Sequence, residues 1–428
     1  MALLVQKYGG TSVGTPERIQ AVADRVARAR RRGDEVVVVV SAMGHTTDEL
    51  VELAEAVTSC DSCTAEHPRE MDMLLSAGER ISMALLAMAI RERGVDARSL
   101  TGSQAAIITD ESHTAARIVE VRADRVRATL DESTVAIVAG FQGVSTTREI
   151  TTLGRGGSDT TAVALACALK ADRCEIYTDV DGVFTCDPRR VPGARIIPRI
   201  SHAEMVEMAQ SGAQVMHARA VDLGARFGMD IRVLSSFVDG PESDDPDRGT
   251  LITENPMAME DLVLTGIASS RGYAKLILRG LPPGMRTPTE VLVALADAGI
   301  SVDMVTEAPD ADGRVLLQLT VREDDLARAR EIAGAVAGRL GGGGTAEERG
   351  GLSRIALVGS GMSGRPGVYA QAYRTLMEAG VEVEAVSTST ISITLLVPAE
   401  GEDAALRALH AGFSLDRPTQ VPAGTAAG

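Results

Sequence analysis

Five consecutive valines, Val36 to Val40, are the feature that most constrains how this chain can fold. A continuous apolar run of this length suits a strand buried on both faces. Comparable strand segments follow at Thr134 to Ala139 and Glu175 to Thr178, and amphipathic helical stretches lie at Arg18 to Arg31, Asp72 to Arg93 and Thr160 to Lys170. Strands alternating with helices form a parallel-rich sheet covered by helices, so residues 1–237 are predicted to be an α/β layered domain.

Composition excludes several function classes. The net charge is −16, which argues against nucleic acid or an anionic membrane as a partner, because phosphate contacts need a basic face. The chain has 5 Tyr, 5 Phe and no Trp, too few rings for a base-stacking platform. A length of 428 residues predicts two to four domains, at roughly 100–200 residues each.

Missing signals bear on localisation. The opening MALLVQKYGGTSVG has no cleavage-site pattern, and no stretch approaches a membrane span of about 18 consecutive apolar residues. Five thinly spread cysteines fit a reducing compartment better than a disulfide scaffold. We therefore expect a cytoplasmic protein.

The C-terminal part contains a repeat. DGPESDDPDRG and GGGGTAEERGG (341–351) have the composition of surface linkers, the second one flexible. Around the second linker, Leu295 to Val305 aligns with Leu376 to Val386, and each copy is a helix end, a glycine and an alternating strand. The element order βαββα occurs twice, which indicates two copies of one small α+β module.

The first strand ends in a glycine pair, within Lys7-Tyr8-Gly9-Gly10-Thr11-Ser12. Backbone N–H groups at such a pair can approach an anion, with the lysine as a point charge. A simple tight turn explains the pair equally well. It is not a Walker A loop, because no lysine follows the glycines at the required spacing.

A second glycine-rich segment, Thr152 to Thr161, leads into a helix. Its three glycines permit close backbone approach, and Ser158, Asp159 and Thr160 stand where N-cap residues belong. The helix N-terminus favours an anion, and Arg155 can grip a carboxylate with two parallel hydrogen bonds. A capped helix alone would not need this arginine.

Three further segments are rich in polar and turn residues: Tyr177 to Arg189, Ser41 to Asp48, and Leu75 to Arg80. The first follows a strand, where open α/β sheets bind ligands. Its Asp-x-Asp-Gly is not an EF-hand loop, since Arg190 stands where the bidentate glutamate belongs.

Taken together, the motifs KYGGTS, SAMGHTTDE, LLSAGERIS, TGSQA, GFQG, TTLGRGGSDTTA and EIYTDVDGVFTCDPR, with the paired modules, resemble aspartokinases. The resemblance extends to about Leu415 and is strongest to the actinobacterial form with one kinase domain and two ACT domains. It implies an amino-acid-kinase α/β/α sandwich followed by two ferredoxin-like (βαββαβ) modules. The expected bounds are 1–238 for the kinase domain, 239–261 for a linker, 262–340 for the first ACT domain, whose first strand could be shared with the second, and 352–416 for the second.

The resemblance also implies a reaction. The γ-phosphoryl of ATP moves to the side-chain carboxylate of L-aspartate, giving 4-phospho-L-aspartate, the first intermediate toward lysine, threonine and methionine. Mg²⁺ bridges the phosphates, and no other metal site is expected.

Site residues follow motif by motif. Lys7 and Asp159 are expected to be catalytic, with Asp159 orienting Lys7. The amino-acid pocket is expected to contain Ser41, Thr47, Glu79, Arg155 and Ser158, with Arg155 on the α-carboxylate and Glu79 on the α-ammonium. Nucleotide contacts are expected from Lys7, Gly9, Gly10, Thr178, Asp179, Phe184 and Arg189. Phe184 and Tyr177 are among the few rings available to adenine.

The chain departs from the family pattern at three places. Gln214 stands where many relatives have lysine, so one positive contact to ATP is missing. Leu281-Pro282-Pro283-Gly284 replaces Asp-Lys-Pro-Gly, and Ser387-Thr388-Ser389-Thr390 replaces Ser-Thr-Ser-Glu. Each of the last two changes, one in each ACT module, removes an acid that could hold an effector's ammonium group. We therefore expect weakened feedback inhibition by lysine and threonine. ACT modules pair between subunits, so a homo-oligomer is expected.

Several alternatives remain. A non-catalytic ACT-based sensor would not need Lys7, Glu79, Arg155 and Asp159, and a glutamate kinase would lack the paired modules. Gly359 to Gly364 matches a dinucleotide fingerprint, but the chain continues directly into another strand, Ile391 to Val397, without a crossover helix. Cys60-x-x-Cys63 has no second pair and favours loop cysteines over a metal or redox site.

Overall fold

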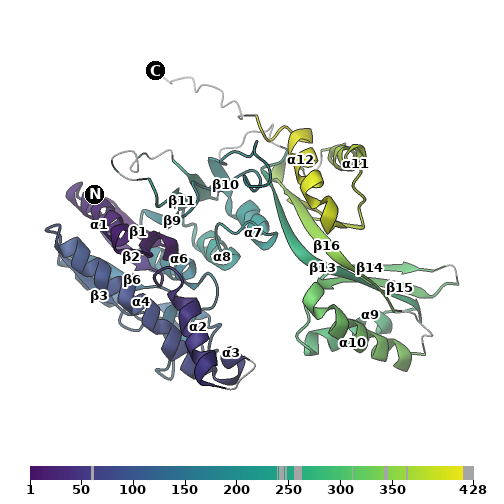
Figure 1. The fold of residues 1–428 in the computed structure, drawn as a ribbon, viewed down its shortest axis with the longest axis horizontal. Coiled ribbons are helices and arrows are strands. Elements are labelled where there is room, and N and C mark those ends of the chain that lie inside the picture. The colour runs from purple at the N-terminus through teal and green to yellow at the C-terminus, as the bar shows by residue number, and fades with distance from the viewer. Residues whose placement is uncertain are drawn as a thin grey trace. The chain divides into compact units, whose positions relative to one another are not determined.

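The structure is a computed structural model that divides into two compact units. It describes the chain except for residues 59–61, 239, 241–244, 246–247, 255–262, 311, 342–345, 363–364 and 418–428. The first unit comprises Met1–Thr185 and Arg195–Met259, and the second comprises Cys186–Ala194 and Glu260–Gly428. Each unit is described on its own (Figure 1).

An eight-stranded sheet forms the centre of the first unit, in the order β10-β12-β11-β9-β1-β2-β6-β3. The strands are β1 (Leu3–Tyr8), β2 (Glu35–Val40), β3 (Ala97–Leu100), β6 (Val135–Ala139), β9 (Arg173–Thr178), β10 (Arg199–Ser201), β11 (Ile231–Ser235) and β12 (Thr250–Thr253). The valine run is β2, parallel to β1 and β6, and all five valines are fully buried. The predicted doubly buried strand is confirmed.

The helices of this unit are α1 (Pro16–Arg31), α2 (Thr46–Val57), α3 (Cys63–Glu66), α4 (Pro68–Arg91), α5 (Asp124–Asp131), α6 (Gly157–Leu169), α7 (His202–Gln210) and α8 (Ala218–Phe227). Most of them cover the main sheet, whereas α2 and α3 pack mainly on α4. Alternate residues of β2 share one core with α1 and α4, while α6 contacts β1, β2 and β9. By length and composition α4 could cross a membrane, but half of its apolar window is buried inside the protein, as in a core helix.

A small second sheet in the same unit has the order β5-β4-β7-β8. Its strands are β4 (Ile107–Thr109), β5 (Ile118–Val121), β7 (Gln142–Ser145) and β8 (Ile150–Thr152). β8 leads directly into the glycine-rich loop before α6, so this sheet sets where that loop starts.

The second unit is built on one six-stranded antiparallel sheet, in the order β14-β15-β13-β16-β18-β17. Its strands are β13 (Gly266–Leu281), β14 (Val302–Pro309), β15 (Val315–Arg322), β16 (Ala346–Val358), β17 (Ala385–Thr388) and β18 (Ser392–Pro398), and its helices are α9 (Arg286–Asp297), α10 (Leu326–Arg339), α11 (Val368–Glu378) and α12 (Glu402–Gly412). The long strands β13 and β16 pair along most of their length, so the two repeats share one sheet.

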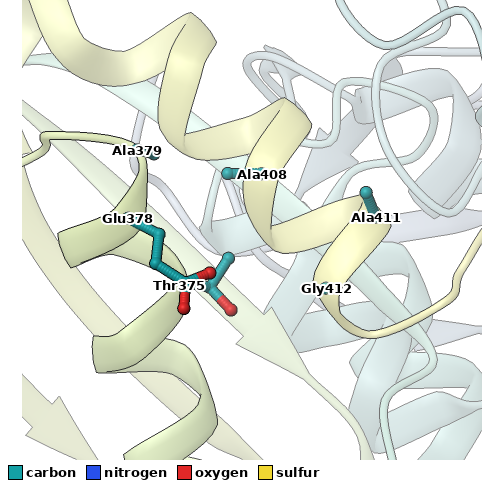
Figure 2. Close-up of a pocket in the computed structure, with 6 residues that line it drawn as sticks. All are labelled: Thr375, Glu378, Ala379, Ala408, Ala411 and Gly412. Carbon is teal, nitrogen blue, oxygen red and sulfur yellow. The ribbon is translucent and has the colours of Figure 1, made fainter.

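The helices of the second repeat, α11 and α12, approach each other closely. A Cβ on Gly412 would lie 2.8 Å from Thr375 Oγ1. A cavity of about 390 Å³ opens between them, lined by Thr375, Glu378, Ala379, Ala408, Ala411 and Gly412 (Figure 2). Its lining is mostly small side chains, as expected where helices pack closely.

Two strands lie in segments whose composition suggested linkers. β12 falls within 239–261 and pairs antiparallel with β11 and parallel with β10, with Thr250 and Ile252 fully buried. β16 begins at Ala346, within the glycine-rich 341–351, because its first residues pair with β13. Much of 239–261 lies outside the described residues.

A short segment from the middle of the chain, Cys186–Ala194, belongs to the second unit. Cys186 and Val191 lie in the apolar core that β16, β18, α11 and α12 form. Arg190 bonds Glu402 at 2.5 Å and also Asp403. Glu402 is fully buried and also accepts from Arg271 and from Ser353 Oγ.

The charge on Glu402 is expected to stabilise the second unit. Burial raises the pKa of this carboxyl, but hydrogen bonds from Arg190 and Arg271 outweigh burial and hold it at about 2. This value lies below the ordinary 4.5, so the stabilisation is full above pH 4.5 and is lost as pH falls toward 2. Glu402→Gln should therefore lower the free energy of unfolding by about 3 kcal/mol at neutral pH.

Hydrogen exchange of α12 in the full chain measures this effect. The difference in the stability of α12 between the wild type and Glu402→Gln should become smaller at about pH 3. Glu400→Gln, at an exposed carboxylate two residues earlier, is the matched control and should change little. An equal loss in both variants would contradict the prediction.

Candidate active site

The polar motifs of the first unit gather at one edge of its main sheet. Tyr8 of β1 pairs with Val40 of β2 and with Tyr177 of β9, all in parallel strands. Gly9, Ser41 and Thr178 follow or end these strands, so they lie together at the carboxyl ends, where open α/β sheets bind ligands.

An ion pair links this edge to α6. Lys7 Nζ lies 2.7 Å from Asp159 Oδ1, and both side chains are nearly buried, at 12% and 11% exposed. Asp159 lies in the first turn of α6, where the helix dipole favours a negative group. Ser158 packs against Gly140, since a Cβ there would lie 2.7 Å from Ser158 Oγ. The predicted Lys7–Asp159 contact is thus present.

One carboxylate oxygen of Glu79 accepts a hydrogen bond, and the other has no donor among the described residues. Its Oε1 accepts from the Ala42 N–H at 3.1 Å, and its Oε2 is buried with no hydrogen-bond partner among the described residues. Gly78 lets α4 come this close, because a Cβ there would lie 2.7 Å from the Ala42 Cβ. Burial raises the pKa of Glu79 to about 7, although the Ala42 N–H partly offsets it. A buried oxygen without a donor suits a ligand that brings one.

Arg155 stands exposed in the loop between β8 and α6. Its neighbours Gly154 and Gly156 have φ of +73° and +70°, a conformation that favours glycine. A Cβ on Gly156 would lie 2.2 Å from the Cβ of His217, so this loop is packed as well as turned. Ser41 and Thr47 are half-buried; the Ser41 carbonyl accepts from Ser82 Oγ at 2.7 Å, and Thr47 lies in the first turn of α2.

The residues expected to contact nucleotide divide into two groups. The Gly9 N–H donates to the Tyr177 carbonyl at 3.3 Å, a Cβ on Gly10 would lie 3.1 Å from the Ala42 carbonyl, and Thr178 Oγ1 donates to Asp179. Phe184, farther along the same loop, pairs with Ile196 in an isolated bridge. Arg189 lies instead in the segment that belongs to the second unit, where it pairs with Asp187 at 2.9 Å.

Tyr177 is not available to a ligand, which corrects the expectation of an adenine contact. It is 4% exposed, its ring stacks on Tyr8 at 4.8 Å, and the Arg25 guanidinium lies 4.6 Å from its ring centroid. The ring had the right place in the sequence, but alternation along β9 turns it into the core.

Sequence reasoning missed Asp72 of α4, a fully buried carboxylate. It accepts from Thr152 Oγ1 at 2.5 Å and from the Thr114 N–H at 3.0 Å, and it lies 2.6 Å from His113 Nδ1. An acid on the apolar face of a helix, seven residues before Glu79, was the available signal.

The other expectations from motifs can be placed too. Ser363 and Gly364 of the glycine fingerprint lie outside the described residues, and β16 before them pairs antiparallel with both neighbours, unlike a dinucleotide-binding strand. Cys60 also lies outside them, while Cys63 begins α3 and is buried. In the described part of the chain, no group of three His, Cys, Asp or Glu could hold a metal.

Comparisons with known proteins decide the family. Residues 2–235 match the amino acid kinase family, and residues 355–413 match an ACT domain. The aspartokinase of Mycolicibacterium smegmatis is 46% identical over 99% of this chain and 100% of its own length, and that of Corynebacterium glutamicum is 47% identical over 97% of each. This chain belongs to the aspartokinase family.

Solved aspartokinase structures agree. E. coli aspartokinase III in complex with aspartate and ADP (R-state) has a TM-score of 0.77 at 28% identity, covering 96% of this chain and 99% of that chain. The same protein in complex with lysine and aspartate (T-state) has a TM-score of 0.70 at 27% identity over the same shares. The predicted fold class, an amino-acid-kinase domain followed by ACT modules, is confirmed, and the protein is a kinase enzyme of the aspartokinase class.

The raised pKa of Glu79 predicts a pH limb in aspartokinase activity. Only the ionised carboxylate can form an ion pair with an ammonium group, and with a pKa of about 7 the free enzyme loses that form as pH falls. We expect kcat/KM for aspartate to fall about tenfold per pH unit below about pH 6. Steady-state assays between about pH 5 and pH 9 measure this.

Glu79→Gln should raise KM and flatten the limb, whereas Glu70→Gln, on the exposed side of the same helix, should leave it intact. An unchanged limb in Glu79→Gln would rule out Glu79 as its source.

Proposed function

We propose that this enzyme transfers the γ-phosphoryl of ATP to the side-chain carboxylate of L-aspartate, giving 4-phospho-L-aspartate and ADP. The reaction would be the first step toward lysine, threonine and methionine, in the cytoplasm. Family membership supports it, as does the likeness to a structure in complex with aspartate and ADP. The observation that carries it is the open, buried Oε2 of Glu79 at the same sheet edge as the Lys7–Asp159 pair.

The amino-acid pocket would recognise the zwitterionic substrate by placing an anionic and a cationic side chain opposite its two charged groups. Glu79 Oε2 would accept from the α-ammonium, which supplies a donor that no described residue provides. Arg155, exposed on its glycine loop, would bind the α-carboxylate in a bidentate manner. Ser41, Thr47 and Ser158 would complete the pocket around the side chain that reacts.

On the phosphate side, Lys7 would stabilise charge that develops on the transferring group. A carboxylate oxygen of aspartate attacks the γ-phosphorus, the bond to the β-phosphate oxygen breaks, and ADP leaves without an enzyme-bound intermediate. Asp159 holds Lys7 in place through the 2.7 Å contact. Gly9, Gly10, Thr178, Asp179 and Phe184 would bind the nucleotide.

Mg²⁺ fits a site of this kind through the nucleotide. This cation is commonly bound by one or two carboxylates together with substrate phosphates, and it neutralises charge between the β- and γ-phosphates. Asp159, which contacts Lys7 through Oδ1, is a carboxylate at this edge that would help hold it.

Regulation and assembly would reside in the C-terminal modules, proposed at 262–340 and 352–416 after a kinase domain at 1–238. Lysine is a proposed effector, because E. coli aspartokinase III has been solved in complex with it. Threonine as a second effector, and the modules as a homo-oligomer contact, are proposed from the family resemblance. Because the loop at Leu281 to Gly284 and the exposed Ser387 to Thr390 lack the acids expected there, inhibition would be weak.

Replacement of Lys7 tests the catalytic assignment. Lys7→Ala should lower kcat about 10²–10³-fold, because it removes a preorganised positive charge from the transition state. Lys170→Ala, at the exposed C-cap of α6, is the control and should retain activity. A coupled ADP-release assay with aspartate against glutamate tests the substrate; faster turnover of glutamate would refute the proposal.

The missing acids predict weak feedback. With lysine and threonine together at millimolar concentration, we expect inhibition below about twofold, against roughly 5–150-fold for typical allosteric coupling. Thr390→Glu restores one acid and should increase inhibition with basal turnover unchanged. Strong concerted inhibition of the wild-type enzyme would contradict this prediction.

A further inference from the structure

Asp72 is a charged side chain that the proposed pocket does not use, yet it is completely buried. A buried carboxylate is costly unless donors satisfy it. Three groups do so here: Thr152 Oγ1 at 2.5 Å, the Thr114 N–H at 3.0 Å, and His113 Nδ1 at 2.6 Å from the second oxygen. None of these groups is on α4, so Asp72 attaches α4 to the end of strand β8 and to the loop that contains His113 and Thr114.

Both attachments restrain the turn that carries Arg155. Thr152 ends β8, three residues before Arg155. Thr114 packs on the same turn from outside, since its carbonyl would lie 3.0 Å from a Cβ on Gly154. Asp72 therefore restrains the arginine loop along its own backbone and through the chain that packs against it.

The same helix carries Glu79. Asp72 and Glu79 are seven residues apart, which is about two turns and about 10 Å along one face of a helix. Glu79 is fixed at the sheet edge by the Ala42 N–H, and Asp72 is fixed to the arginine loop. α4 is thus a rigid spacer between the two charges of the proposed pocket.

We propose that Asp72 is a positioning residue that sets the distance between Glu79 and Arg155, and so the fit of the zwitterionic substrate. The proposal rests on the assignment of Glu79 and Arg155 to the substrate. Weakening the Asp72 contact lets the arginine loop shift, so the α-carboxylate and α-ammonium can no longer be held together. The effect falls on aspartate binding and leaves the Lys7–Asp159 pair and the nucleotide loop untouched.

The chain offers a matched set of variants. Thr152→Val removes only the hydroxyl that reaches Asp72, and Thr152→Ser keeps it. Thr151→Val is the control: Thr151 is equally buried, one residue earlier, but its hydroxyl meets Thr109 Oγ1 at 2.6 Å on the other side of β8. Thr151→Val thus has the same kind of hydroxyl loss in the same strand without touching Asp72.

We expect Thr152→Val to raise KM for aspartate about tenfold, the cost of one hydrogen bond to a charged group, with kcat and KM for ATP within about twofold. Thr152→Ser should restore KM, and Thr151→Val should leave it near wild type even if its melting temperature falls. Asp72→Asn, which keeps the volume, should act in the same direction as Thr152→Val.

Arg155→Ala in the same assay separates the proposed substrate-binding role of Arg155 from the proposed positioning role of Asp72. If Arg155→Ala raises KM for aspartate and Thr152→Val does not, the positioning role of Asp72 is wrong while the pocket stands. If neither variant changes KM, both are wrong. If Thr151→Val and Thr152→Val raise KM equally, the effect is general loosening of β8, which also overturns the role.

Discussion

A central strand that is excluded from solvent on both faces has to be covered by helices on both sides, and most of the first unit follows from this constraint. β2 can form only between other strands, with α1 and α4 on one face and α6 near the other. The polar residues that follow this strand in the sequence therefore lie at the edge of the sheet where the parallel strands end. Most side chains elsewhere in the sheet are apolar and buried, so the polar motifs that follow the strands gather at this edge.

Buried carboxylates show how burial and function are connected here. Burying a charge is costly, so each such group needs partners. Asp72 has three donors, and Glu402 has arginines from two other parts of the second unit. Glu79 has one donor for two oxygens, and its pKa is correspondingly raised. Among the described residues, both oxygens of Asp72 and of Glu402 are engaged, whereas Glu79 has one buried oxygen without a donor.

The sequence pattern predicted those elements whose structure is determined by neighbouring residues. The valine strand, the helix that begins after the glycine loop, and the contact of Lys7 with Asp159 could all be expected from the residues and the family motifs. β12 and the start of β16 could not, because their residues are ordinary linker types that become strands only by pairing with distant partners. The side that Tyr177 faces depends on the register of β9. The role of Asp72 depends on His113 and Thr152, which are some 40 and 80 residues away in the sequence.

The segment Cys186–Ala194 means that the second unit is not a continuous stretch of the polypeptide. Part of its apolar core, Cys186 and Val191, and one of the two arginines on Glu402 come from a loop just beyond β9. A fragment cut at the apparent boundary would keep the whole six-stranded sheet yet lack these groups. It would expose core surface and leave Glu402 with only Arg271 of its two arginine partners, so exchange of these modules between relatives would have to include the loop.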